Sequence, residues 1–133
     1  DGDVMLPQNL ERHTLDWRDV GFRKVHGLRQ RLLHIAPPAE IAVIEENLNW
    51  QRSAATHAAQ INAIAASDLI VDATGDPATA LLLGALAASA QKPFVSVEVF
   101  AGGIGALVAS CLPERDPPFV IAFDPTKQAR GPS

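Results

Sequence analysis

Apolar side chains recur at helical spacing in two stretches of this chain. The first stretch predicts a helix over residues 20–35, which the proline pair at 37–38 ends. The second predicts a helix over residues 54–66, where small side chains permit close packing on a sheet. The two apolar stripes consist of Val25, Leu28, Leu32 and Ile35, and of Ala58, Ile61 and Ala65.

Short, continuous apolar runs between these helices predict strands. The run at residues 68–72 begins and ends with aspartate and is typical of a central parallel strand. Asp76 and Pro77 then suit the N-cap and the first position of a third helix. Further strands are expected over residues 41–44, 93–99 and 104–112, and residues 1–5 fit the end of another.

The alternation of strands and helices predicts an α/β fold. We expect a Rossmann-like, doubly wound and mostly parallel sheet, truncated at the N-terminus and closed by a C-terminal strand or hairpin. The chain has 133 residues, of which 47% are apolar, so it can bury a core as one domain over residues 1–133. Residues 113–133 form an extended tail, in which the apolar run at 119–123 needs a packing partner.

Composition excludes several functional classes. A net charge of −4 argues against nucleic-acid binding. The apolar runs are too short to predict a membrane span. The single cysteine, Cys111, rules out an internal disulfide and suggests a reducing compartment, so we expect a cytoplasmic protein.

Three short polar motifs occupy the first 24 residues: Asp1-Gly2-Asp3, Asn9-Leu10-Glu11-Arg12 and Gly21-Phe22-Arg23-Lys24. In a Rossmann-like sheet, the acidic residue that ends the second strand accepts hydrogen bonds from ribose hydroxyls. Asp1 is the candidate for this role. Two solvated carboxylates near a chain end are the alternative interpretation of the first motif.

The order and spacing of these motifs resemble the adenylating domain of the ThiF/MoeB/HesA and ubiquitin-activating enzyme family. That family's pattern is Asp-x-Asp, five residues, Asn-Leu-x-Arg-Gln and then Asp-x-Gly-x-x-Lys, and here only Gln changes, to His13. The resemblance runs from residue 1 to about residue 112. It implies an ATP site in which Arg12 and Lys24 bind phosphate and take part in catalysis. The implied nucleotide-binding residues are Asp1, Asp3, Asn9, Arg12 and Lys24.

Both cations also have simpler interpretations. Arg12 could form a surface salt bridge with Asp16 or Asp19, and Lys24 could be a solvated lysine. A cation in the first turn of a helix is poorly placed relative to the helix dipole. Nucleotide phosphates would compensate this misfit at Lys24, so it favours a ligand role.

The family likeness also implies a magnesium site after the strand at residues 68–72. The family motif is Asp-x-Thr-Asp-Asn, in which the second Asp helps to hold magnesium, and here Gly75 stands in its place. Asp72 and Asp76 are therefore the remaining candidates for metal ligands. A plain helix cap is the alternative for Asp76.

Other features do not predict chemistry. The glycine-rich stretch at residues 101–105 precedes a predicted strand and not a helix, so it fits a turn rather than a phosphate loop. Cys111 at a strand end fits a buried, inert thiol. Zinc is not expected, because the chain has no Cys-x-x-Cys pair and its histidines lack metal-binding spacing.

The motifs predict the C-terminal part of an ATP-dependent adenylyltransferase, which activates the C-terminal glycine of a ubiquitin-like or sulfur-carrier protein. We expect the chain to be inactive alone, because it lacks the family's Gly-rich nucleotide loop. Two alternatives stay open: a non-catalytic ThiF-like binding or regulatory module, and half of an NAD(P)-binding oxidoreductase domain. The expected cofactors are ATP and Mg²⁺. Self-association as a homo-oligomer is expected from the apolar runs and the open sheet edge.

Overall fold

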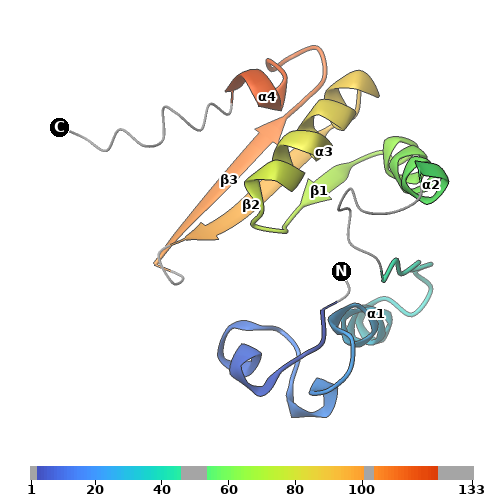
Figure 1. Cartoon of the computed structure of the whole chain (residues 1–133), viewed down its shortest axis with the longest axis vertical. Coiled ribbons are helices and arrows are strands. Elements are labelled where there is room, and N and C mark those ends of the chain that lie inside the picture. Colours follow the sequence, from blue (N-terminus) through green and yellow to red (C-terminus); the bar gives the residue numbers. More distant parts are fainter. Residues whose placement is uncertain (1–2, 46–53, 101–103, 123–133) are drawn as a thin grey trace. The chain divides into compact units, whose positions relative to one another are not determined.

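The computed structural model describes residues 3–45, 54–100 and 104–122 (Figure 1). Its contacts divide the chain into two compact units, Asp1–Asn49 and Trp50–Ser133. The expectation of a single domain stays a prediction. Asp1, residues 101–103 of the glycine-rich stretch and the end of the tail lie outside the described residues.

The described residues of the first unit form three helices: the 3-10 helices Pro7–Arg12 and Trp17–Asp19, and α1, Lys24–Ile35. Its entry segment runs antiparallel to the residues that precede α1. The Met5 N–H donates to the Phe22 carbonyl at 2.8 Å, and the Gly21 N–H donates to the Met5 carbonyl at 2.9 Å. The expected strand end at residues 1–5 is thus an isolated bridge between Val4 and Arg23.

Helix α1 begins at Lys24, four residues later than the apolar pattern predicts. Gly21 has a φ of +89°, a left-handed conformation that glycine adopts without steric cost. This turn sends the chain back along residues 3–5 before the helix starts. The buried residues here are Met5 and Leu15, and Gly27 of α1 packs directly against the Leu15 side chain.

The prediction of a buried strand over residues 41–44 is wrong. These described residues form no strand, and Ile44 is 48% exposed. The carbonyl of Ile41 accepts a 3.0 Å hydrogen bond from Arg29 Nε of α1, so a side chain takes the place of a neighbouring strand. An apolar, β-branched run is compatible with an irregular segment of this kind as well as with a core strand.

The second unit holds a three-stranded sheet with helices beside it (Figure 1). Strand β1 is parallel to β2, and β2 is antiparallel to β3, in the order β1-β2-β3. Strand β1, α3 and β2 follow one another as a parallel βαβ unit, which confirms the Rossmann-like α/β class, and β2 with β3 supplies the expected C-terminal hairpin. The elements are α2 (Ala54–Ala65), β1 (Ile70–Asp72), α3 (Pro77–Ser89), β2 (Phe94–Phe100), β3 (Gly105–Cys111) and α4 (Phe119–Ala122).

Strand β1 lies at the edge of the described sheet, whereas the sequence predicted a central strand. Its alternate residues Ile70 and Asp72 are buried, and Val71 between them is 57% exposed. One face of β1 is therefore covered and the other is open within the described part of the chain.

Helix α3 packs on β1 and β2 through small residues. Its buried positions are Ala80, Leu83, Gly84 and Ala87. Phe119 of α4 fits against Gly84 and meets Phe94 edge to face, with ring centroids 4.9 Å apart and planes at 74°. The apolar run that begins at Phe119 thus finds a partner inside the second unit. Among the described helices, none combines the length and apolarity needed to cross a membrane.

Candidate functional site

Lys24 and Asp3 meet where the first unit's chain enters α1. Lys24 Nζ lies 3.3 Å from Asp3 Oδ2, and the Lys24 N–H donates to the Asp3 carbonyl at 2.9 Å. The Lys24 side chain is 17% exposed and the Asp3 side chain 62%. The structure therefore brings together the acid of the first motif and the cation of the third.

The second motif forms a turn of 3-10 helix. Asn9 Oδ1 accepts a 3.0 Å hydrogen bond from the Leu6 N–H, so Asn9 holds the start of this turn. Arg12 is the last residue of the 3-10 helix, and its side chain lies outside the described part of the structure. The roles of Arg12 and Asp1 toward a nucleotide stay predictions.

Asp16, one of the two aspartates that could pair with Arg12, forms an ion pair with Arg18. Asp16 Oδ2 lies 2.6 Å from Arg18 Nη2. The side-chain hydrogen bond from Arg18 lowers the pKa of Asp16 to about 2, and the Arg18 N–H adds to this effect. Asp19 Oδ2 accepts from the Asp16 N–H at 3.0 Å.

Other basic side chains, at the N-cap of α1 and within the helix, contact neighbouring parts of the first unit. Arg23 Nε and His26 Nε2 lie 3.2 Å and 2.7 Å from the two carboxylate oxygens of Glu45. The hydrogen bond with His26 is the main cause of the lowered pKa of Glu45, and the charge of Arg23 follows. Arg31 Nη1 donates to the Thr14 carbonyl. These side chains connect α1 to its surroundings.

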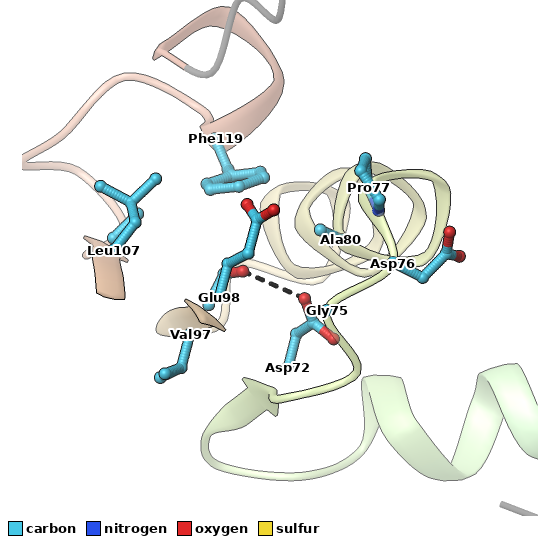
Figure 2. A pocket seen from close by; sticks show the side chains of 11 residues that line it. Asp72, Gly75, Asp76, Pro77, Ala80, Val97, Glu98, Leu107 and Phe119 are labelled. Atoms are coloured by element: carbon cyan, nitrogen blue, oxygen red, sulfur yellow. Dashed lines mark hydrogen bonds between the residues drawn. The ribbon is translucent and has the colours of Figure 1, made fainter. Parts of the chain in front are cut away.

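In the second unit, Asp72 ends β1 with a buried carboxylate. It is 2% exposed, and both of its oxygens accept hydrogen bonds from the protein. Oδ1 accepts from the N–H and the hydroxyl of Thr74 at 3.0 Å and 2.7 Å. Oδ2 accepts from the Ser96 hydroxyl of β2 at 3.0 Å (Figure 2).

Asp76 caps α3. Its Oδ2 accepts from the hydroxyl and the N–H of Thr79 at 2.6 Å and 2.9 Å. These two hydrogen bonds lower the pKa of Asp76 below its usual value of 3.8, and the bond from the hydroxyl has the larger effect. Figure 2 shows the Asp76 carboxylate turned away from Asp72. The cap, which was the alternative interpretation of Asp76, is thus present in the structure.

A small pocket lies between β2, β3 and the start of α3, where the parallel strands end (Figure 2). In open α/β sheets, ligands bind at the carboxyl ends of the strands. The polar side chains that line the pocket are Asp72, Asp76, Ser96 and Glu98. Gly75, which has a φ of +67°, also lines the pocket.

These donors do not fit a magnesium site. Magnesium needs near-octahedral geometry, which one or two carboxylate oxygens complete together with several waters. Asp72 already accepts three hydrogen bonds, and Asp76 is turned to its helix. Within the described ranges, no three His, Cys, Asp or Glu side chains form a group that could hold a metal ion. The assignment of Asp72 and Asp76 as metal ligands stays a prediction without geometric support.

Sequence reasoning missed Ser96 and Glu98. Both lie on the face of β2 that α3 covers, following the buried Phe94 at two-residue intervals. A polar residue on the covered face of an apolar strand is the signal that could have found Ser96. Its pairing with Asp72 depends on strand register, which the sequence does not reveal.

Cys111 ends β3 and is partly buried. Burial, and then the charge of Asp116, raise the pKa of its thiol above the usual value of 9.0. A raised thiol pKa disfavours the nucleophilic thiolate, in keeping with an inert cysteine.

Comparison with known proteins shows which family the chain belongs to. The sequence profile of the ThiF family matches residues 1–128. A 76-residue segment, 57% of the chain, is 33% identical to the ATP-dependent ubiquitin transferase-like protein Cap2 of Pseudomonas aeruginosa (strain BWHPSA011 / Pa011). The matched segment spans 12% of the length of that relative. Because the family profile covers nearly the whole sequence, the chain belongs to the ThiF family.

Proposed function

We propose that this chain is part of an ATP-dependent adenylyltransferase that activates the C-terminal glycine of a ubiquitin-like or sulfur-carrier protein. Membership of the ThiF family supports the reaction class. The name of the relative Cap2, an ATP-dependent ubiquitin transferase-like protein, supports ATP as cofactor and a ubiquitin-like partner. The identity of the partner protein is left open by both.

In the proposed reaction, a carboxylate oxygen of the partner's C-terminal glycine attacks the α-phosphorus of ATP. A new oxygen–phosphorus bond forms, the bond from the α-phosphorus to its bridging oxygen breaks, and pyrophosphate leaves. Negative charge grows on the leaving phosphates, and positioned cations stabilise it. Arg12 and Lys24 are the proposed cations, Asp1 the proposed ribose ligand, and Asn9 the residue that shapes the intervening turn.

The placement of Lys24 carries this proposal. Lys24 is the first residue of α1, directly after the turn at Gly21, as the family motif requires. Its side chain is 17% exposed, and its ammonium group lies 3.3 Å from the Asp3 carboxylate. A phosphate that binds Lys24 would take over part of the role of Asp3. Mg²⁺ stays an expectation from the family likeness.

ATP–pyrophosphate exchange by the full-length protein with a candidate carrier protein tests the proposal. We expect carrier-dependent exchange that falls at least tenfold in Lys24→Met and in Arg12→Ala. Arg18→Ala is the matched control, because Arg18 is 89% exposed and pairs with Asp16. Absence of exchange with every carrier tested, or equal rates in Lys24→Met and Arg18→Ala, would contradict the proposal.

One observation favours a second candidate, a ThiF-like binding or regulatory module without catalysis. Gly75 replaces the family's metal-binding Asp, and both carboxylate oxygens of Asp72 accept hydrogen bonds from within the protein. Such a module would bind a ubiquitin-like partner, with or without ATP, and would release no pyrophosphate. Partner binding without exchange would select this candidate. Homo-oligomerisation and a cytoplasmic location are further expectations, which light scattering and fractionation of the full-length protein would test.

A further inference from the structure

We infer that Ser96 and Asp72 form a positioning pair, which sets the turn between β1 and α3, and that Asp72 acts in this pair and not as a metal ligand. The pair joins neighbouring parallel strands, because Asp72 and Ser96 are direct partners in the register of β1 and β2. Neither residue belongs to the motifs that identify the family's phosphate-binding cations.

The contacts of Asp72 account for its burial. A buried carboxylate is costly unless hydrogen bonds compensate the loss of water. Asp72 receives three such bonds, two from Thr74 and one from the Ser96 hydroxyl, which is itself 8% exposed. Ser96 supplies the bond that comes from another strand, so it fixes the carboxylate relative to the sheet.

The hydrogen bonds continue from Asp72 into α3. The Thr74 hydroxyl donates to Asp72 and accepts from the Asp76 N–H at 3.2 Å. Asp76 in turn accepts from the N–H and the hydroxyl of Thr79 in the first turn of the helix. An unbroken chain of side-chain hydrogen bonds therefore runs from β2, through the end of β1, to the start of α3.

This chain of bonds fixes the turn that lines the pocket at the strand ends. Gly75 in the turn has a φ of +67° and no atom within 4 Å of the position a Cβ would take, so packing alone does not hold it. Thr74 and Asp76 on either side are the residues that the bonds restrain. The inference rests on the proposed function in one respect, namely that the full-length protein binds ATP.

Amide hydrogen exchange of the full-length protein tests the positioning role. In Ser96→Ala we expect the Asp76 and Thr79 amides to exchange roughly tenfold faster, because a buried acceptor loses its donor. Ser96→Thr keeps a hydroxyl and restores slow exchange. Ser110→Ala, at an exposed serine of β3, is the matched control and leaves both amides unchanged. Equal exchange in Ser96→Ala and Ser110→Ala would overturn the hydrogen-bonded chain.

Manganese titration tests the role assigned to Asp72. We expect Asp72→Asn to change Mn²⁺ affinity less than twofold, with or without ATP. A wild-type protein that shows no saturable Mn²⁺ binding would also agree with the inference. Loss of saturable Mn²⁺ binding in folded Asp72→Asn would overturn the inference. If Asp72→Asn does not fold, Ser96→Ala is measured in its place. If Asp72 were a metal ligand, the loss of the Ser96 hydrogen bond would free its carboxylate, and Mn²⁺ affinity would rise. Such a rise would overturn the inference.

ATP affinity separates this inference from the proposed function. If the wild-type protein binds ATP, we expect several-fold weaker binding in Ser96→Ala and recovery in Ser96→Thr, at a temperature where all variants are folded. Unchanged ATP affinity in Ser96→Ala would overturn the positioning role. If the wild-type protein binds no ATP, the proposed function fails, and the exchange and Mn²⁺ measurements decide the inference alone.

Discussion

Lys24, the first residue of α1, forms an ion pair with Asp3, with Nζ 3.3 Å from Oδ2. The two residues belong to the first and third motifs that identify the ThiF family in this chain. The cation proposed to bind phosphate therefore has a partner in the protein itself. A nucleotide must compete with Asp3 for it, or bind beside both groups.

We expect the Lys24–Asp3 pair to contribute little to stability. Exposed ion pairs are typically worth about 0.2–1 kcal/mol, and the Asp3 side chain is 62% exposed. A double-mutant cycle with Asp3→Asn and Lys24→Met, measured by denaturant unfolding, should give a coupling energy in this range. The coupling should fall at 1 M salt. A coupling that salt does not change would contradict a solvent-screened pair.

The helix cap at Asp76 should make stability depend on pH. Its pKa in the folded chain is below the usual value of 3.8, so the cap contributes stability that is present above that pH. This contribution is lost as the pH falls through the folded-state pKa. Asp76→Asn keeps a capping oxygen without a titrating group, so the stability difference from wild type should shrink below pH 3.8. A difference that stays constant from pH 7 to strongly acidic pH would contradict the assignment.

Gly84 should tolerate no larger side chain. A Cβ at this position would lie 2.6 Å from Phe119 Cδ1, and Phe119 is buried against Phe94. Overpacking of this kind typically costs about 1–3 kcal/mol, so Gly84→Ala should lower the free energy of unfolding by that amount. In the double variant Gly84→Ala/Phe119→Leu, part of the clash is removed. Its loss of unfolding free energy should therefore be smaller than the sum of the losses in the two single variants. Strictly additive effects would show that the contact is absent.

Cys111 should react slowly with alkylating reagents. Burial and the nearby charge of Asp116 raise the pKa of the thiol, so less thiolate is present at a given pH. Iodoacetamide should modify Cys111 more slowly than a free thiol, and Asp116→Asn should increase the rate. Modification of Cys111 as fast as that of a free thiol would contradict the raised pKa.

The sequence predicted best where local chemistry decides the structure. The start of α3 could be predicted to the residue, because Asp76 caps the helix and Pro77 suits its first position. The start of α1 could not, because the left-handed turn at Gly21 and the pairing of Met5 with Phe22 override the helical apolar pattern.

Features that depend on contacts distant in sequence were harder to predict. The apolar run at 41–44 was expected to form a strand, but the Ile41 carbonyl pairs with Arg29 of α1, 12 residues away. Asp72 was identified from its motif, yet its partner Ser96 is 24 residues away and is set by strand register. The three motifs were nevertheless sufficient to identify the family, because the spacing of motif residues is a property of the sequence alone.

Calorimetric titration of the full-length protein with ATP tests the central claim most directly, namely that Arg12 and Lys24 bind the triphosphate. A hydrogen bond to a charged group is typically worth about 1.5–3 kcal/mol, so Arg12→Ala and Lys24→Met should each weaken ATP binding roughly tenfold or more, whereas Arg18→Ala should not. Equal ATP affinity in all three variants, or no ATP binding by the wild-type protein, would contradict the claim.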